Sequence, residues 1–291
     1  MAFLSYLISG LGLGSVYAII ALGYSMVYGI AKMLNFAHGD IIMVGAYAAF
    51  FMLNSFGLPL IPAILVSVVV CVLLGVVTER LAYKPLRQAS SLAVLITAIG
   101  VSYFLQNAAQ LLWGADTKIF PSVISQGGFD FGGLHVAYLT LITIAANILI
   151  MVLLSLFINK TKTGRAMRAC SEDKGAASLM GVNVDSIISI TFAIGSGLAA
   201  IAAVLLCSTY PSLYPTLGSM PGIKAFTAAV FGGIGSIPGA FLGGLLLGVI
   251  EIFARAYIST QLSDAIVFGV LIVVLLIKPT GLLGKKISEK V

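Results

Sequence analysis

The sequence predicts an all-α polytopic membrane protein with eight or nine transmembrane helices, some of them short or broken. Hydrophobic residues make up 60% of its 291 residues, and charged residues only 9%. The mean hydropathy of +1.12 is far above that of a water-soluble domain. A helix needs roughly 20 apolar residues to cross a bilayer, and such stretches follow one another with short polar joints between them. We therefore expect a single transmembrane domain over residues 1–291.

Eight apolar stretches predict the helices that cross the membrane. They cover residues 4–29, 41–55, 60–79, 91–113, 136–158, 187–209, 239–256 and 262–277. A ninth stretch, residues 223–234, is too short to cross alone as an ordinary helix, and glycine and proline flank it on both sides. We interpret it as a half-helix or a short, tilted crossing.

The distribution of basic residues predicts the orientation of the chain. Short cytoplasmic loops collect Lys and Arg, and thirteen of the 16 basic residues lie in four clusters. All four clusters face the cytoplasm only if residues 223–234 also cross, which predicts nine passages, an outside N-terminus and a cytoplasmic C-terminus. The clusters are Lys32; Arg80, Lys84 and Arg87; Lys160, Lys162, Arg165, Arg168 and Lys174; and Lys278, Lys285, Lys286 and Lys290.

The formal net charge of +6 does not indicate a nucleic-acid-binding protein, because the basic residues lie in joints and form no basic domain. Two of the three cysteines, Cys71 and Cys207, lie in apolar stretches, and Cys170 lies in a basic joint. This spacing fits neither a disulfide framework nor a zinc site. We expect three free thiols and no bound metal.

A glycine-rich stretch in the last third of the chain indicates close helix packing and a helix break. It contains Gly232, Gly233, Gly235, Gly239, Gly243 and Pro238. The last three glycines recur every four residues and share one helix face, which most often serves helix packing alone. The first two glycines and the proline should also break the helix. Freed backbone groups persist at membrane depth only beside protein or a water-filled cavity, so we place this stretch near a translocation path.

A polar cluster precedes the second apolar stretch and contains Asn35, His38, Gly39 and Asp40. A histidine beside an aspartate could form a proton relay, but no apolar stretch carries the further ionisable groups that a proton-driven pump requires. Capping of the following helix by Asp40 is the simpler interpretation. Gly39 and Gly235 each begin a run of small residues at a predicted cytoplasmic border, which hints at an internal repeat.

Glu251 and Arg255 lie one helical turn apart within an apolar stretch. Isolated charge is costly in a membrane, and the i, i+4 spacing lets the two side chains neutralise each other. Because Arg255 lies near the predicted outer end and can reach the interface, we expect a structural pair rather than a contact with substrate.

The basic joint of residues 159–186 is the clearest cytoplasmic segment. Within it, residues 171–181 predict a short helix, with Ser171 as N-cap, Glu172 and Asp173 in the first turn and Gly181 at the end. Such a helix could lie on lipid headgroups. Its mixed charges and alanines fit a docking surface for a partner protein better.

The sequence lacks the motifs of an ATPase or a hydrolase. The nearest match to a phosphate-binding loop, Gly281 to Lys286, has the wrong spacing. No Gly-x-Ser-x-Gly or His-Glu-x-x-His motif is present, and His38 and His135 lie on opposite predicted sides of the membrane. We expect a non-catalytic protein that binds no cofactor of its own.

Short segments spread over essentially the whole chain carry a family resemblance when taken jointly and in order. They are Gly14-Ser-Val-Tyr-Ala-Ile-Ile-Ala-Leu-Gly-Tyr24, Leu34-Asn-Phe-Ala-His-Gly-Asp40, Gly45-Ala-Tyr47, Gly164-Arg-Ala-Met-Arg-Ala169, Ser171-Glu-Asp173, Ala176-Ala177, Gly181 and Phe231-Gly-Gly-Ile-Gly-Ser236. With these segments the chain resembles the permease subunits of ATP-binding-cassette importers for branched-chain amino acids, specifically the H-type subunit of the bacterial Leu/Ile/Val system.

The resemblance implies a heteromeric importer of the bacterial inner membrane. Two related permeases would enclose the path, two cytoplasmic ATPases would bind ATP and Mg, and a soluble periplasmic binding protein would deliver the substrate. This chain would form half of the path and carry branched-chain amino acids by alternating access. It would contact membrane lipid and no nucleic acid.

The resemblance also implies a role for the basic joint. In importer permeases, a cytoplasmic Glu-Ala-Ala-x-x-x-Gly loop inserts a short coupling helix into a groove on the ATPase. Ala176, Ala177 and Gly181 match that spacing, whereas Gly175 stands at the Glu position. We expect residues 171–181 to couple to the ATPase, with Glu172 and Asp173 supplying the acidic contacts.

Two other classes of transporter stay open on the residues alone. An ion-coupled secondary transporter should place ionisable residues near the midplane of broken helices, and this sequence has few of them. A passive channel for a small polar solute would use the glycine breaks as a filter, which leaves the capped cytoplasmic helix without a purpose. The substrate itself is indicated only by the resemblance.

Overall fold

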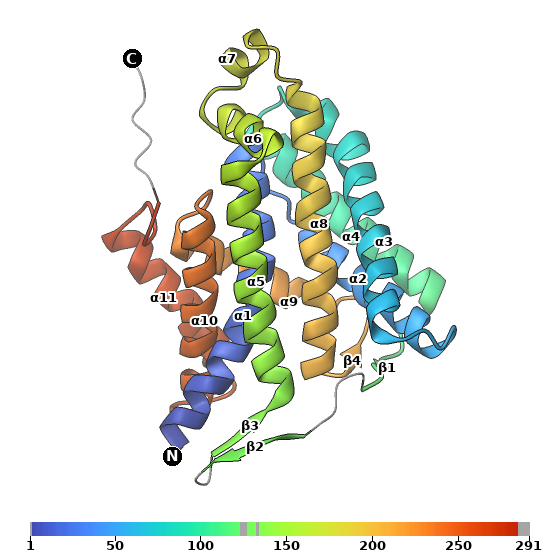
Figure 1. The fold of residues 1–291 in the computed structure, drawn as a ribbon, viewed down its shortest axis with the longest axis vertical. Coiled ribbons are helices and arrows are strands. Elements are labelled where there is room, and N and C mark those ends of the chain that lie inside the picture. The colour runs from blue at the N-terminus through green and yellow to red at the C-terminus, as the bar shows by residue number, and fades with distance from the viewer. Residues whose placement is uncertain (1, 123–126, 132–133, 285–291) are drawn as a thin grey trace.

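The computed structural model describes residues 2–122, 127–131 and 134–284, which are helical almost throughout (Figure 1). The predicted fold class, an all-helical polytopic membrane protein, is confirmed. Among the described residues, six helices are long and apolar enough to cross a bilayer, counting α3 with the turns that follow it. The helices are α1 (Ala2–Ala31), α2 (His38–Asn54), α3 (Leu60–Thr78), α4 (Ser91–Trp113), α5 (Tyr138–Lys160), α6 (Lys162–Glu172), α7 (Lys174–Leu179), α8 (Val184–Thr209), α9 (Ser219–Gly232), α10 (Ile237–Tyr257) and α11 (Ser263–Ile277).

The ends of the long helices follow local chemistry. Helix α4 has the predicted bounds because the Ser90 hydroxyl accepts a hydrogen bond from the Ala93 N–H and caps its start. Helix α8 starts three residues earlier than predicted because Asn183 caps it in the same way. Helix α3 continues beyond its predicted end through a π-helical turn, Glu79–Tyr83, and a 3-10 turn, Lys84–Leu86. Glu79 and Tyr83 are fully buried, so protein contacts extend the helix where its apolar run has ended.

Helix α1 is the centre of the bundle and is buried along most of its length. It contacts α10 most extensively, and it also contacts α8, α5 and α9. Gly14 allows the approach of α10, since a Cβ on Gly14 would lie 2.7 Å from the carbonyl oxygen of Leu245. Gly248 of α10 in turn faces the backbone of Gly14. Backbone contact of this kind is the usual basis of helix association in lipid.

The two ends of the bundle differ in structure. Helices α6 and α7 lie at one end, and the N-terminus and the short strands lie at the other (Figure 1). The strands are β1 (Lys118–Ile119), β2 (Gly128–Phe131), β3 (Leu134–Ala137) and β4 (Ser212–Leu213), with β1 paired to β4 and β2 to β3 in antiparallel register. The segments that carry these strands therefore lie at the end opposite the basic joint. Three residues of the last basic cluster, Lys285, Lys286 and Lys290, lie outside the described residues.

Apart from α6 and α7 at the end of the bundle, three of the described helices are too short to span a hydrocarbon core about 30 Å thick. Helices α2, α9 and α11 have 17, 14 and 15 residues, or about 25, 21 and 22 Å at 1.5 Å per residue. The ninth apolar stretch is therefore a short helix, as predicted. It starts four residues earlier than expected and ends at Gly232, because Gly233 has a φ of 108° that breaks the α-helix.

Helices α2 and α9 begin beside each other inside the bundle rather than at its ends. A Cβ on Gly39 would lie 2.5 Å from the carbonyl oxygen of Gly218, so the two helix starts meet backbone to backbone. The neighbouring His38 ring lies 4.7 Å from the ring of Tyr24. Tyr24 precedes the end of α1 by seven residues, or about 10 Å along its axis.

Substitution of the α10 glycine that faces α1 tests this packing. We expect Gly248→Ala to lower the free energy of unfolding by about 1–3 kcal/mol, because the added methyl group meets backbone atoms of Gly14 that cannot rotate away. Thermal unfolding in detergent measures the change. Gly100→Ala is the matched control, since a Cβ there meets nothing within 4 Å. Equal stability of the two variants would contradict the packing argument.

Candidate functional site

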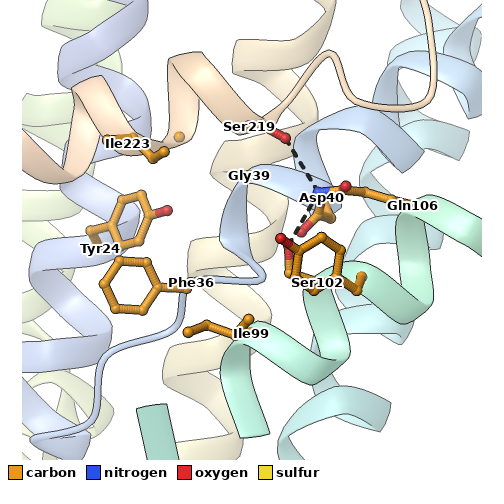
Figure 2. Close-up of a pocket in the computed structure, with 11 residues that line it drawn as sticks. Tyr24, Phe36, Gly39, Asp40, Ile99, Ser102, Gln106, Ser219 and Ile223 are labelled. Carbon is orange, nitrogen blue, oxygen red and sulfur yellow. Dashed lines mark hydrogen bonds between the residues drawn. The ribbon is translucent and has the colours of Figure 1, made fainter. Parts of the chain in front are cut away.

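A cavity of about 240 Å³ lies where the short helices α2 and α9 begin. Helices α1 and α4 complete its wall (Figure 2). Its wall combines hydroxyl, amide and carboxylate groups with aromatic and aliphatic side chains. The residues that line it are Tyr24, Phe36, Gly39, Asp40, Ile99, Ser102, Tyr103, Gln106, Ser219, Gly222 and Ile223. A mostly apolar wall with a few convergent polar groups is the usual composition of a small-molecule site.

Asp40 is the charged group of this wall, and it is only 1% exposed. Its Oδ1 accepts a hydrogen bond from Nε2 of Gln106 at 2.8 Å. The interpretation of Asp40 as a helix cap is wrong: α2 has Ala37 at its N-cap position, without any side-chain capping bond. Asp40 lies in the first turn because α2 already begins at His38, and its side chain points across to Gln106 and Ser102 of α4. Within the described part of the chain, no Lys or Arg forms an ion pair with it.

Gln106 connects three helices at the cavity. Besides Asp40 on α2, its Nε2 lies 3.2 Å from the hydroxyl oxygens of Ser102 on α4 and Ser219 at the start of α9. Figure 2 shows these groups converging from separate elements. An amide nitrogen carries only two protons, so it cannot satisfy all three oxygens at once. The polar wall can therefore exchange partners when a solute enters.

The other members of the predicted polar cluster point away from the cavity. Asn35 accepts a hydrogen bond from the Tyr83 hydroxyl at 2.8 Å and so ties the segment before α2 to the end of α3. His38 is 1% exposed and packs on Tyr24, and its Nε2 has no hydrogen-bond partner. The predicted cluster thus separates into two supporting residues and two cavity residues, Gly39 and Asp40.

The five glycines that were predicted to lie near the path are not part of the cavity wall. Gly232 of α9 meets Gly239 and Gly243 of α10 through backbone atoms. Gly233 and Gly235 form the connection between the two helices, and the Gly235 N–H donates to the Ser25 hydroxyl of α1 at 2.8 Å. These glycines hold α9 against α10 and α1, which sets the position of the α9 residues in the cavity wall.

A second buried polar cluster joins α9, α10 and α11. Glu251 is fully buried, and its Oε1 contacts both Lys224 Nζ, at 2.7 Å, and the Arg255 guanidinium. Lys224 also pairs with Asp264 at 2.6 Å. The predicted pair of Glu251 and Arg255 is therefore present, but Lys224 is a further member of the cluster that the prediction did not include. Sequence reasoning missed Lys224, although a lysine inside the short apolar stretch 223–234 was the available signal.

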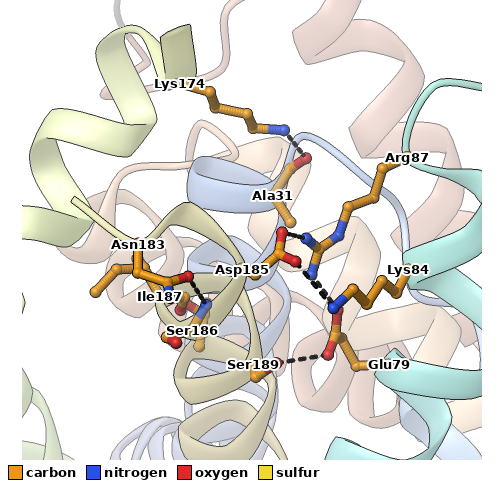
Figure 3. Close-up of polar contacts among 11 residues, drawn as sticks. Ala31, Glu79, Lys84, Arg87, Lys174, Asn183, Asp185, Ser186, Ile187 and Ser189 are labelled. Carbon is orange, nitrogen blue, oxygen red and sulfur yellow. Dashed lines mark hydrogen bonds and ion pairs between the residues drawn. The ribbon is translucent and has the colours of Figure 1, made fainter. Parts of the chain in front are cut away.

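The end of the bundle near α6 and α7 carries a network of charged side chains (Figure 3). Glu79 is buried and contacts the Arg87 guanidinium, and it accepts a hydrogen bond from the Ser189 hydroxyl at 2.7 Å. Asp185 pairs with Arg87 and, at 2.9 Å, with Lys84. The network joins the end of α3 to the start of α8. It accounts for the buried position of Glu79 at a membrane border.

The predicted short helix of residues 171–181 has different bounds in the structure. Ser171 and Glu172 are the last residues of α6, and Asp173 caps α7 by accepting a hydrogen bond from the Ala176 N–H at 3.0 Å. The assignment of Ser171 as N-cap is therefore wrong, because Asp173 accepts that capping bond instead. Gly181 follows the end of α7, close to where it was predicted to end the helix. Its φ of 82° is the left-handed conformation in which glycine commonly terminates a helix.

Helix α7 presents an apolar tip to solvent and is anchored by one lysine. Leu179 and Met180 are 91% and 84% exposed, whereas Ala177 is buried. Lys174 donates a hydrogen bond from Nζ to the carbonyl oxygen of Ala31, the last residue of α1, at 2.6 Å. Burial lowers the pKa of Lys174 below its usual range, and the nearby charges of Arg87 and Lys32 lower it further. Helix α7 is thus joined to the end of the helix that carries Tyr24.

Removal of Lys224 tests the buried cluster. Loss of one partner of a buried ion pair typically costs about 3–5 kcal/mol, and we expect Lys224→Met to cost less because Arg255 still faces Glu251. The double variant Lys224→Met/Glu251→Gln should regain part of the stability, since no uncompensated carboxylate is then buried. Thermal unfolding measures both, with exposed Lys162→Met as the control. Additive losses in the double variant would exclude the coupling.

Comparison with known proteins places the whole chain among transport permeases. Residues 6–275 match the family described as "Branched-chain amino acid transport system / permease component". The chain is 47% identical to the "High-affinity branched-chain amino acid transport system permease protein BraD" of Pseudomonas aeruginosa, over 99% of this chain and 98% of that protein. It is 45% identical to the corresponding protein LivH of Escherichia coli, with the same coverage. A probable LivH permease of Methanocaldococcus jannaschii is 29% identical over 91% of this chain and 88% of that protein.

Proposed function

This chain belongs to the family of permease components of branched-chain amino acid transport systems, and from this premise we propose that it is one transmembrane subunit of an ATP-driven importer. In this proposal it forms half of the path for branched-chain amino acids, and a second, related permease forms the other half. Two cytoplasmic ATPases bind ATP and Mg. A soluble periplasmic binding protein delivers the substrate.

The proposal assigns the two ends of the bundle to the two sides of the bacterial inner membrane. The end with α6 and α7 faces the cytoplasm, where it also collects the basic residues of the joint. The N-terminus and the strand pairs face the periplasm and are available to the binding protein. The C-terminus returns to the cytoplasmic side.

The observation that carries the proposal is the apolar tip of α7. An exposed Leu179 and Met180 on a capped helix, outside any transmembrane segment, are costly in water and fit a groove on a partner protein. In the importer this partner is the ATPase, and α7 is the coupling helix. Asp173 and Glu172 flank it at the other end and supply acidic contacts.

The contacts of α7 give a route from ATP hydrolysis to the path. Lys174 links α7 to the end of α1, and Tyr24 of α1 lines the cavity. Closure of the ATPases would move α7, shift α1 against the start of α2 and change access to the cavity. The charged network of Glu79, Arg87 and Asp185 holds the adjacent ends of α3 and α8 and forms the pivot of this motion.

One alternative has a specific observation in its favour. Asp40, Glu251 and Lys224 are buried charged residues in the bundle, more than the sequence indicated, and such groups also occur in ion-coupled secondary transporters. The two classes differ in their energy source. Uptake that needs ATP and no ion gradient supports the importer, and uptake by the chain alone under an ion gradient supports the alternative.

Charge placed on the tip of α7 tests the coupling role. We expect the double variant Leu179→Asp/Met180→Asp to lose the ATPases on copurification and to lose ATP-dependent leucine uptake, because two carboxylates cannot enter an apolar groove without partners. Phe129→Asp, an exposed apolar residue at the opposite end, is the matched control and should keep the ATPases. Retention of the ATPases by the double variant would contradict this role for α7.

A further inference from the structure

We propose that Asp40 binds the α-ammonium group of an amino acid in the cavity between α1, α2, α4 and α9. The permease subunit then selects zwitterionic amino acids itself, in addition to any selection by the binding protein. This inference rests on the proposed function, because it names the group by which the substrate of that importer is recognised.

The first argument is the missing countercharge. A carboxylate that is 1% exposed normally pairs with a cation, since burial of an isolated charge is costly. Two other buried carboxylates among the described residues, Glu251 and Glu79, each contact Lys or Arg. Asp40 has two neutral partners, the Gln106 amide and the Ser102 hydroxyl, and faces a cavity. No Lys or Arg in the described part of the protein pairs with Asp40. A cationic group that enters the cavity would supply the missing positive charge.

The second argument is the distribution of the other groups around the cavity. The start of α9 faces it with the Ser219 hydroxyl, and helix starts carry partial positive charge that favours a carboxylate. Phe36, Ile99 and Ile223 provide apolar surface for an aliphatic side chain. The wall therefore offers separate places for the ammonium, carboxylate and hydrocarbon parts of one amino acid.

The third argument is size. The cavity volume of about 240 Å³ lies just below the range of about 300–1,000 Å³ that is usual for ligand pockets. This space suits one small amino acid and is too small for an oligopeptide. Gly39 and Gly222 add no side chain to the cavity, and they let the two helix starts approach closely, since a Cβ on Gly222 would lie 3.0 Å from Cα of Gly39.

A cysteine protection experiment on the complete importer tests the inference. The parent carries Ile223→Cys in the cavity wall, and the native thiols of Cys71, Cys170 and Cys207 are all buried. The rate of maleimide labelling is measured with leucine, with 4-methylpentanoate, which lacks the ammonium group, and with 3-methylbutylamine, which lacks the carboxylate. We expect leucine to slow labelling, the amine to do so weakly, and 4-methylpentanoate to have no effect.

The same measurement with Asp40→Asn isolates the charge. Hydrogen bonds to charged groups are worth enough that the leucine concentration for half-protection should rise by about 10–100-fold. Asn keeps the shape and a partner for Gln106, and copurification of the ATPases confirms assembly. Asp116→Asn, an exposed acid outside the cavity, should leave the half-protection concentration unchanged.

The outcomes separate the two proposals. Equal protection by leucine and 4-methylpentanoate, or unchanged protection in Asp40→Asn, would overturn ammonium recognition in an importer that still takes up leucine with ATP. No protection by leucine in such an importer would overturn the cavity as the site. Failure of the native complex to import any branched-chain amino acid would instead overturn the proposed function.

Discussion

The backbone contact between Gly39 and Gly218 is the constraint on which the rest of the structure depends. Two helices too short to cross a bilayer begin at this contact, inside the bundle. Helix α2 runs from it toward β4, and α9 runs from it to the glycines that meet α10. Helix ends at membrane depth persist only where protein or a cavity satisfies their backbone groups. The cavity is therefore a consequence of this contact.

Central packing explains why the contact survives without a hydrophobic driving force between helices. Lipid is as apolar as the helix surfaces, so association relies on close van der Waals contact and polar bonds. Helix α1 supplies both: Gly14 meets α10 through the backbone, and Ser25 accepts the Gly235 N–H. Because α1 contacts α5, α8, α9 and α10, one helix fixes the position of most elements around the cavity.

Buried carboxylates have two different kinds of partner in the described part of this bundle, and the difference indicates function. Glu79 is compensated by Arg87 at the end with α7, and Glu251 by Lys224 and Arg255 between α9, α10 and α11. Both clusters join separate elements, and in each the buried carboxylate contacts a Lys or Arg of the chain. Asp40 has only the neutral side chains of Gln106 and Ser102 as partners among the described residues, and neither supplies a positive charge. A charge left open at a cavity wall is what a binding site for a cation requires.

The sequence by itself determined the membrane class, the bounds of the long helices to within a few residues, the short helix before Gly233 and the glycine that follows the end of α7, Gly181. These features depend on hydropathy, glycine and capping residues within a few positions, which a single chain displays directly. Only the tertiary structure decided that Asp40 faces Gln106 instead of capping α2, that Lys224 joins Glu251, and that Lys174 reaches Ala31. Each of these contacts joins residues far apart in the chain. Whether two such residues meet depends on how whole helices pack against each other. No local pattern of residues specifies that packing.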